Sequence, residues 1–332
     1  MCGIVGAVSE RNIEKILIKG LKRLEYRGYD SAGLAVIDAN HQLLRLRTLG
    51  KVRELESVLL SSDFHGLIGI AHTRWATHGE PSEDNAHPLT SHDQFALVHN
   101  GIIENYESLR ERLLEKGYSF TSETDSEAIV HLLHFHYQST QDFLKAIQQT
   151  VAELEGAYAL GIISSLHPNQ LIAVRQGSPL VIGQGIAENF FASDPLALSP
   201  VTKQFIYLED GDIANITCHS IEIYNADMKH VERKVHNIEL DFNIADRGEY
   251  RHFMSKEIFE QPNAIEANLE GRITKSTVLD TAFGMQAKEI FSKVKHVQLV
   301  ACGTSYHAAM VARYWIESLA QSKLRANIGI EK

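Results

Sequence analysis

The first residue whose type and position could do chemistry is Cys2, which follows Met1 in the opening stretch MCGIVGAV. Met1 is a candidate for removal because the next residue is small. Cys2 would then carry a free α-amine, whose pKa of about 7.7–8.0 suits a general base at neutral pH. A thiol and its base would share one residue, as in nucleophiles that use their own N-terminal amine. From this residue alone, a small buried cysteine is an equally good interpretation.

A second group of candidates lies in the stretch HTRWATHG, which contains Arg74, Trp75, Thr77 and His78. An arginine guanidinium binds a carboxylate through two parallel hydrogen bonds, so Arg74 could hold an acidic group of a substrate. The alternatives are a surface charge for Arg74 and core packing for Trp75.

The stretch HNGIIEN places Asn100 and Gly101 at the end of an expected strand. An asparagine amide and a glycine N–H aimed at one point form an oxyanion hole, although Asn-Gly is also a strong turn signal. Further on, Asp125 begins an expected helix in which Thr124 and Glu127 form a capping box. An acid is favoured there by the helix dipole, and it could instead bind a substrate ammonium.

Near the C-terminus, Thr304 and Ser305 lie in the small-residue stretch ACGTSYH after an apolar strand. Their hydroxyls and the N-terminus of the following helix could bind a phosphate, although many strand-to-helix turns contain such residues. The histidines of HLLHFH do not share one helical face and have no accompanying carboxylates, so no metal site is predicted.

The elements that must position these residues are strands at both ends of residues 1–237 with helices grouped between them. Strands are expected at 2–8, 33–38, 43–50, at the start of 67–79 before a loop, at 94–103 and in several segments from 158 to 225. Helices are expected at 12–28, 105–117, 124–137 and 140–156. This order favours two antiparallel sheets with helices outside them over a regular βαβα winding. From 238 the chain reads as a connector ending in a helix, followed by a lone strand and helix at 294–320.

Composition excludes several classes of protein. The 332 residues are 44% hydrophobic and 22% charged, which is typical of a soluble globular chain. With 32 Lys and Arg against 42 Asp and Glu, the net charge of −10 gives no general attraction to nucleic acid or an anionic membrane. No stretch approaches the roughly 18 apolar residues of a membrane span, and no signal peptide is recognisable. The three cysteines are far apart, which favours a reducing cytoplasm.

Taken together, the motifs resemble the N-terminal glutaminase of the class II glutamine amidotransferases. MCGIVG is shared widely in that class, whereas LEYRGYDSAG, HTRWATHGEP, HNGIIEN and SETDSE resemble more specifically the members that aminate fructose 6-phosphate. The resemblance continues through MSKEIFEQPNAI to ACGTSYHAAM, which is similar to the start of a sugar-isomerase domain. It implies a four-layer αββα N-terminal-nucleophile hydrolase domain at 1–237, a connector at 238–290, and the first strand and helix of an incomplete sugar-isomerase (SIS) domain at 291–332.

The resemblance also implies roles. Cys2 would be the nucleophile with its own amine as the base, and Asn100 and Gly101 would form the oxyanion hole. The glutamine carboxylate would be held by Arg74 with Thr77 and His78 nearby, and the glutamine ammonium by Asp125. Trp75 would gate the route of ammonia. Thr304 and Ser305 would be the first contacts to the phosphosugar.

The expected partners are therefore glutamine and, in a full-length enzyme, fructose 6-phosphate, which would be converted to glucosamine 6-phosphate. The resemblance implies a homodimer for the full-length enzyme and no organic or metal cofactor, and the composition predicts no nucleic acid and no membrane as partners. Two alternatives stay open: the glutaminase of another class II amidotransferase, and an inactive domain that senses glutamine or a sugar phosphate and keeps Met1.

Overall fold

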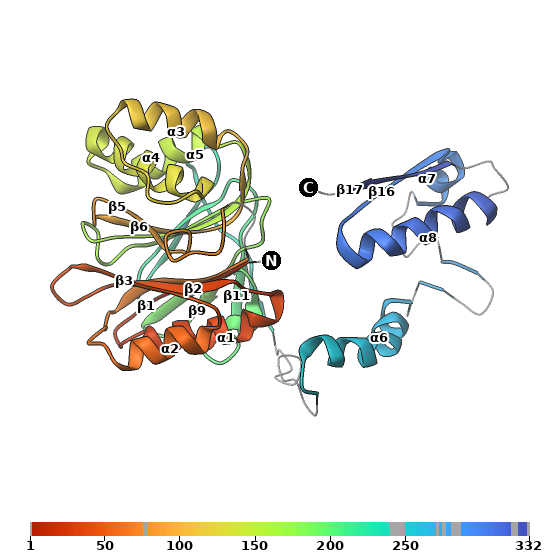
Figure 1. Cartoon of the computed structure of the whole chain (residues 1–332), viewed down its shortest axis with the longest axis horizontal. Helices are drawn as coiled ribbons and strands as arrows, with labels where there is room; N and C mark the ends of the chain where they lie inside the picture. Colours follow the sequence, from red (N-terminus) through yellow and green to blue (C-terminus); the bar gives the residue numbers. More distant parts are fainter. Residues whose placement is uncertain are drawn as a thin grey trace. The chain divides into compact units, whose positions relative to one another are not determined.

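The computed structural model describes residues 2–75, 79–238, 250–269, 272–273, 277–279, 287–319 and 325–330. The chain divides into two compact units, Met1–Asp246 and Arg247–Lys332, each of which is described by itself (Figure 1). The finer division at 237 and 290 stays a prediction.

The first sheet of the N-terminal unit is antiparallel and has eight strands within the described residues. Their order across the sheet is β15-β11-β9-β10-β1-β4-β2-β3. The strands are β1 (Gly3–Ser9), β2 (Ser31–Ile37), β3 (Leu43–Leu49), β4 (Ile68–Arg74), β9 (Val181–Gln184), β10 (Glu188–Ala192), β11 (Gln204–Tyr207) and β15 (Val235–Asn237).

The second sheet is also antiparallel and has seven strands within the described residues, in the order β14-β13-β12-β8-β7-β6-β5. The strands are β5 (Leu89–Ser91), β6 (Phe95–Ile103), β7 (Gly156–Ser164), β8 (Leu171–Gln176), β12 (Ile213–Ile216), β13 (Ile221–Tyr224) and β14 (His230–Val231). The expected pair of antiparallel sheets is confirmed.

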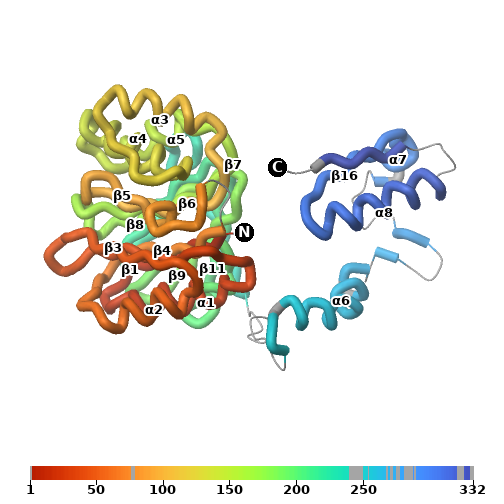
Figure 2. The backbone as a smooth tube through the Cα atoms, in the orientation of Figure 1, coloured from red at the N-terminus to blue at the C-terminus, as the bar shows by residue number. Residues whose placement is uncertain are grey.

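Helices cover the outer face of each sheet (Figures 1 and 2). The first sheet packs against α1 (Glu14–Leu24) and α2 (Val52–Leu60), with short 3₁₀ turns at η1 (Glu25–Arg27) and η2 (Pro195–Leu198). The second sheet packs against α3 (Tyr106–Glu115), α4 (Asp125–Thr140) and α5 (Phe143–Glu153). The result is the expected four-layer αββα arrangement.

Alternation along the strands separates three apolar cores. On β1, Val5 and Ala7 pack toward α1, whereas Ile4 and Val8 face the layer between the sheets. The period of two in strands produces this division, because successive side chains point to opposite faces. The ring of Phe191 fills the layer between the sheets. β1 therefore has one face toward a helix and the other face toward the second sheet.

The start of α4 differs from the predicted capping box. Thr124 is the N-cap residue as expected, but its side chain makes no capping hydrogen bond. Glu127 accepts instead from the N–H groups of Thr121, at 2.9 Å, and Ser122, at 2.6 Å. The loop before the helix folds back over the first turn, so the carboxylate meets earlier donors than the sequence motif implies.

The C-terminal unit contains α6 (Phe253–Leu269), α7 (Ala287–Lys293), β16 (His296–Ala301), α8 (Gly303–Leu319) and β17 (Arg325–Ile330). The expected strand and helix are β16 and α8. However, α8 starts at Gly303, earlier than predicted, and β17 pairs in parallel with β16. The expectation of a lone strand was therefore wrong. Along the parts of the chain with described structure, no helix has the length and apolar character needed to cross a membrane.

Candidate active site

Cys2 lies beside the end of β4. The pairing of β1 with β4 sets Gly3 opposite Thr73, which brings the residue before β1 next to the residue after β4. The backbone N–H of Trp75 donates to the Cys2 Sγ at 3.1 Å, and the same sulfur lies 3.4 Å from the backbone carbonyl oxygen of Trp75. Backbone pairing alone therefore positions the thiol.

Burial raises the pKa of the Cys2 thiol above its ordinary value, although the Trp75 N–H and the charge of Arg74 act in the opposite direction. The raised pKa favours the protonated thiol at neutral pH. A nucleophilic Cys2 consequently requires a base to take its proton. Met1, whose removal would create such a base, lies outside the described residues.

Asn100 and Gly101 lie within β6 rather than in a hairpin turn, so the turn interpretation of Asn-Gly is wrong. The Asn100 Nδ2 donates to the Cys2 carbonyl oxygen at 3.2 Å. Gly101 is exposed and has a φ of 135°. A Cβ at this position would lie 2.0 Å from the Ala157 carbonyl oxygen, so only glycine fits. The structure brings the Asn100 amide and Cys2 together.

Arg74 ends β4 and is buried, with a side chain that is 4% exposed. Its guanidinium lies 3.4 Å from the Asp30 carboxylate and donates to the carbonyl oxygens of Gly79, at 3.1 Å, and Glu80, at 3.4 Å. These contacts hold the guanidinium at the end of β4, where Trp75 follows in the chain.

Asp125 is buried in the first turn of α4. Its Oδ2 accepts from the Ile103 N–H at 2.9 Å, and its Oδ1 accepts from the Ser126 hydroxyl at 3.1 Å. Ile103 is the last residue of β6, so this bond ties the carboxylate to the strand that carries Asn100. The carboxylate and the amide are thus held by one strand.

Trp75 is 53% exposed, which excludes the core-packing interpretation. Its ring lies over Gly28, where a Cβ would come within 2.4 Å of the indole. Thr77 and His78, two further candidates from the same stretch, lie outside the described residues.

Thr304 and Ser305 are both exposed in the first turn of α8, because the helix begins at Gly303. The expected small-residue loop is thus shorter than predicted. Their hydroxyls remain at a helix N-terminus, and their role stays a prediction. They belong to the C-terminal unit, whereas all the other described candidates belong to the N-terminal unit.

Sequence reasoning missed the buried polar residues behind the site. The His72 Nε2 lies 3.0 Å from both the His99 carbonyl oxygen and the Asn100 Oδ1. The His99 Nδ1 lies 2.8 Å from the Ser126 Oγ, which itself donates to Asp125. A signal existed, because a histidine on a buried strand requires a polar partner.

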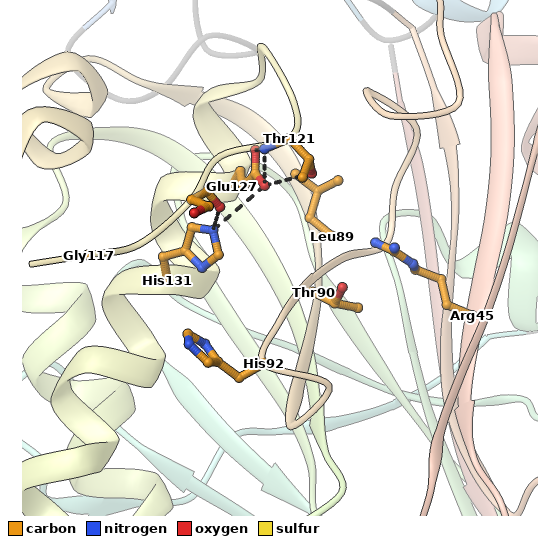
Figure 3. Close-up of a pocket in the computed structure, with 9 residues that line it drawn as sticks. Arg45, Leu89, Thr90, His92, Gly117, Thr121, Glu127 and His131 are labelled. Atoms are coloured by element: carbon orange, nitrogen blue, oxygen red, sulfur yellow. Dashed lines mark hydrogen bonds and ion pairs between the residues drawn. The ribbon is translucent and has the colours of Figure 1, made fainter. Parts of the chain in front are cut away.

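A cavity of about 300 Å³ is lined by none of these site residues (Figure 3). It is lined by Arg45, Leu89, Thr90, His92, Gly117, Ser119, Thr121, Glu127 and His131. Burial alone would raise the pKa of Glu127, but hydrogen bonds from His131, Thr121 and Ser122 lower it to about 2. The Glu127 carboxylate is already hydrogen-bonded to Thr121 and Ser122, and Arg45 is exposed to solvent. We therefore assign this cavity no ligand. The hydrogen bonds of Glu127 tie Thr121 and Ser122 to the first turn of α4, which also carries Asp125.

The histidines of α4 have protein partners. His131 lies 2.9 Å from the Ser91 Oγ, His134 lies 2.7 Å from the Tyr118 hydroxyl, and His136 lies 2.8 Å from the Glu153 carboxylate. Within the described ranges, no three His, Cys, Asp or Glu side chains are grouped to hold a metal ion.

Comparison with known proteins identifies the region around the site. Residues 72–200 match the family model of the glutamine amidotransferase domain. The glutamine–fructose-6-phosphate aminotransferase (isomerizing) of Legionella pneumophila (strain Paris) is 54% identical over 331 residues, which is 100% of this chain and 55% of that protein. The enzyme of the same name from Pseudomonas aeruginosa is 56% identical over 331 residues, which is 100% of this chain and 54% of that protein.

Among solved structures, a glutamine phosphoribosylpyrophosphate amidotransferase from B. subtilis aligns with a TM-score of 0.59 at 21% identity. The alignment covers 99% of this chain and 66% of that one. This likeness shows that the chain shares the fold of that structure, in which two stacked sheets lie between layers of helices. The chain spans about half the length of the curated relatives it matches. Residues 72–200 are therefore similar to a glutamine amidotransferase domain, and the whole chain aligns with about half of the glutamine–fructose-6-phosphate aminotransferases.

Proposed function

We propose that the N-terminal unit hydrolyses glutamine to glutamate and ammonia with Cys2 as the nucleophile. The observation that carries this proposal is the meeting of three groups at one place. The Cys2 thiol accepts the Trp75 N–H, and the Asn100 amide nitrogen lies 3.2 Å from the Cys2 carbonyl oxygen. The match to the glutamine amidotransferase family supports the assignment.

The reaction begins when the α-amine of mature Cys2 takes the thiol proton, which the raised thiol pKa makes necessary. The sulfur attacks the side-chain carbonyl carbon of glutamine, and a C–S bond forms. The Asn100 amide and the Gly101 N–H receive the oxyanion. The C–N bond then breaks, and the protonated α-amine returns its proton to the leaving nitrogen, which departs as ammonia.

Water next attacks the glutamyl thioester, and the same amine removes its proton. A second oxyanion forms in the same hole, and the C–S bond breaks. The amine returns its proton to the Cys2 sulfur, and glutamate leaves. Arg74, with Thr77 and His78, holds the substrate carboxylate, and Asp125 holds its ammonium. Clamping both charged ends makes the attack an oriented, near-unimolecular step. Asp125 suits this role because it is buried and charged groups bind strongly in such surroundings.

For the whole protein of which this chain is a part, we propose that the ammonia converts fructose 6-phosphate to glucosamine 6-phosphate. The curated relatives bear the name of that reaction. Trp75 gates the passage of ammonia, and Thr304 and Ser305 contact the phosphosugar. We further propose a homodimer in the cytoplasm, where a reducing environment keeps the three free cysteines as thiols.

Glutamate release from glutamine alone tests the proposal. We expect release from the chain without Met1 and none from Cys2→Ala or from a chain that retains Met1, as checked by mass spectrometry of the N-terminus. Cys218→Ala provides the matched control, because Cys218 lies in the same unit and packs against the apolar layer between the sheets. Equal glutamate release by the Cys2→Ala chain would exclude Cys2 as the nucleophile.

A further inference from the structure

His72 lies on β4, an interior strand of the first sheet, and faces the second sheet. It stands on β4 opposite Ile4 of β1 and Gly33 of β2, and it is 0% exposed. From there its Nε2 reaches across the sandwich to β6, where it lies 3.0 Å from both the His99 carbonyl oxygen and the Asn100 Oδ1. It is therefore a link between the two sheets directly behind the candidate oxyanion hole.

The two neighbours of Nε2 determine which ring nitrogen carries the proton. A carbonyl oxygen can only accept, so Nε2 must be the protonated nitrogen and donate. Burial lowers the pKa of His72 to about 3, which keeps the ring neutral and leaves Nδ1 bare. Within the described residues, Nδ1 has no hydrogen-bond partner. The ring is thus a fixed single donor at neutral pH.

A fixed donor at this position selects one orientation of the Asn100 amide. With Oδ1 toward His72, the amide nitrogen faces Cys2 and donates to its carbonyl oxygen at 3.2 Å. The flipped amide would set its N–H groups against the His72 N–H and its oxygen against the Cys2 carbonyl oxygen. Both of these contacts are repulsive, so the donor of the oxyanion hole stays on the side of Cys2.

We infer that His72 is a positioning residue for glutamine hydrolysis, and that it acts by holding the Asn100 amide nitrogen toward the nucleophile. The inference rests on the proposed function, in which Asn100 stabilises the oxyanion. It assigns His72 no contact with substrate. It also explains why a histidine is buried on this strand, because a permanently charged donor would be costly in such dry surroundings.

The test is a double-mutant cycle on the full chain. His72→Phe keeps an aromatic ring but removes the donor, and His72→Gln returns an N–H close to the position of Nε2. Losing an oxyanion-hole donor outright costs about 10²–10³ in kcat, and we expect His72→Phe to cost about 10–100-fold with KM changed less than about threefold. His72→Gln should recover kcat to within about fivefold of the unmodified chain.

The decisive arm combines these changes with Asn100→Ala. If His72 acts only through Asn100, then His72→Phe has no further effect on kcat once the amide is gone. Losses that multiply, or a loss confined to KM, would overturn the inference. His87→Phe is the matched control. The ring centroids of His87 and His72 lie 4.4 Å apart, and within the described residues neither ring nitrogen of His87 has a hydrogen-bond partner. It should leave kcat close to that of the unmodified chain.

A second readout does not depend on activity. Nitrogen-15 NMR should show His72 as the neutral Nε2–H tautomer throughout pH 5–8, and His72→Phe should shift the side-chain amide signals of Asn100. A protonated or Nδ1–H ring would overturn the inference. If glutamate release does not depend on Cys2, the proposed function is refuted, and the NMR measurement alone then tests the orientation of the Asn100 amide. Should His72→Phe fail to fold, His72→Asn, whose amide is too short to reach β6, takes its place against His72→Gln.

Discussion

The two units differ most in where their large apolar side chains go. In the N-terminal unit, Phe191 is 0% exposed between two sheets, whereas in the C-terminal unit Trp315 is 66% exposed on α8. Two further apolar side chains of the C-terminal unit, Phe259 and Leu319, are 68% and 82% exposed. The N-terminal unit has four layers, so both faces of each sheet are covered. The C-terminal unit has two paired strands among its described residues, and such a small sheet leaves amphipathic helices with little to pack against.

This comparison teaches that an amphipathic pattern predicts an element but not its burial. α1 and α8 are both helices with an apolar face, yet α1 buries Leu17 and Leu21 completely, whereas α8 buries Ala309. Burial depends on whether a second layer faces the helix. The following experiments test whether this difference in burial determines how strongly substitutions in each unit affect stability and activity.

The largest contrast is expected between two glycines with positive φ. Gly101→Ala would place its Cβ 2.0 Å from the Ala157 carbonyl oxygen, whereas Gly303, with a φ of 56°, has nothing within 4 Å. We expect Gly101→Ala to displace the backbone donor and reduce glutamine hydrolysis by at least about 100-fold. Gly303→Ala should cost only about 1–2 kcal/mol for its left-handed backbone. Hydrolysis rates and melting temperatures check this, and equal losses of rate in the two variants would break the comparison.

The next contrast concerns buried and exposed rings. Phe191→Ala should lower the free energy of unfolding by about 3–5 kcal/mol, because its ring is enclosed by both sheets and lies over Gly6 and Gly161. Trp315→Ala should change it by no more than about 0.5 kcal/mol, since most of the ring faces solvent. Urea unfolding monitored by circular dichroism measures both. A similar cost for the two substitutions would show that the exposed fraction does not describe α8.

A third prediction uses the acid stability of the N-terminal unit. The pKa of Glu127 is about 2 when folded and about 4.5 ordinarily, so the folded state favours the carboxylate. The corresponding stabilisation is complete above pH 4.5 and is lost as the pH falls toward 2. It amounts to on the order of 3 kcal/mol at pH 7 and about 1 kcal/mol at pH 3.

Glu127→Gln removes this titration, so the difference in unfolding free energy between the two chains should shrink as the pH falls. Unfolding in urea at pH 7, 5 and 3 measures that difference. A difference of the same size at pH 7 and pH 3 would contradict the prediction. Glu123→Gln, in the adjacent loop, is a control for the loss of a carboxylate that also accepts backbone and side-chain hydrogen bonds.

The smallest effect is expected from removing the C-terminal unit. The three apolar cores consist of residues up to Ile238, so a chain that ends at Asp246 keeps them all. We expect its stability to change by less than about 1 kcal/mol, which corresponds to about 2–4 °C in melting temperature. Calorimetry of both chains checks this. A much larger fall would show that the C-terminal unit stabilises the N-terminal one.

Much of the fold could be predicted because the N-terminal strands and helices have strong and different periods. Where local patterns compete, the sequence was less informative. Asn100 and Gly101 suggested a turn, but pairing with β7 keeps them in a strand, and Glu127 fits a capping box but meets donors from a loop. The strand β17 was missed because its partner β16 lies before an intervening helix, and such pairing leaves no local signal.

The sequence offers candidate site residues where chemistry and motif coincide, as at Cys2 and Asp125, and their roles stay predictions. The site was not predictable where a residue acts through another. The stretch GIAHTR does not indicate that His72 contacts Asn100, which lies 28 positions later in the chain and on the second sheet. Such contacts depend on sheet order and register, which alternation alone does not specify.

The position of Trp75 makes the site its own optical probe. The chain has two tryptophans, Trp75 and Trp315, one in each unit. The backbone N–H of Trp75 contacts the Cys2 sulfur, and the indole ring of the same residue is half exposed over Gly28. Its emission should therefore respond to any group joined to that sulfur. In a Trp315→Phe chain all tryptophan fluorescence would come from this one ring. Formation and breakdown of a thioester could then be followed in a stopped-flow instrument without a dye or a coupled assay.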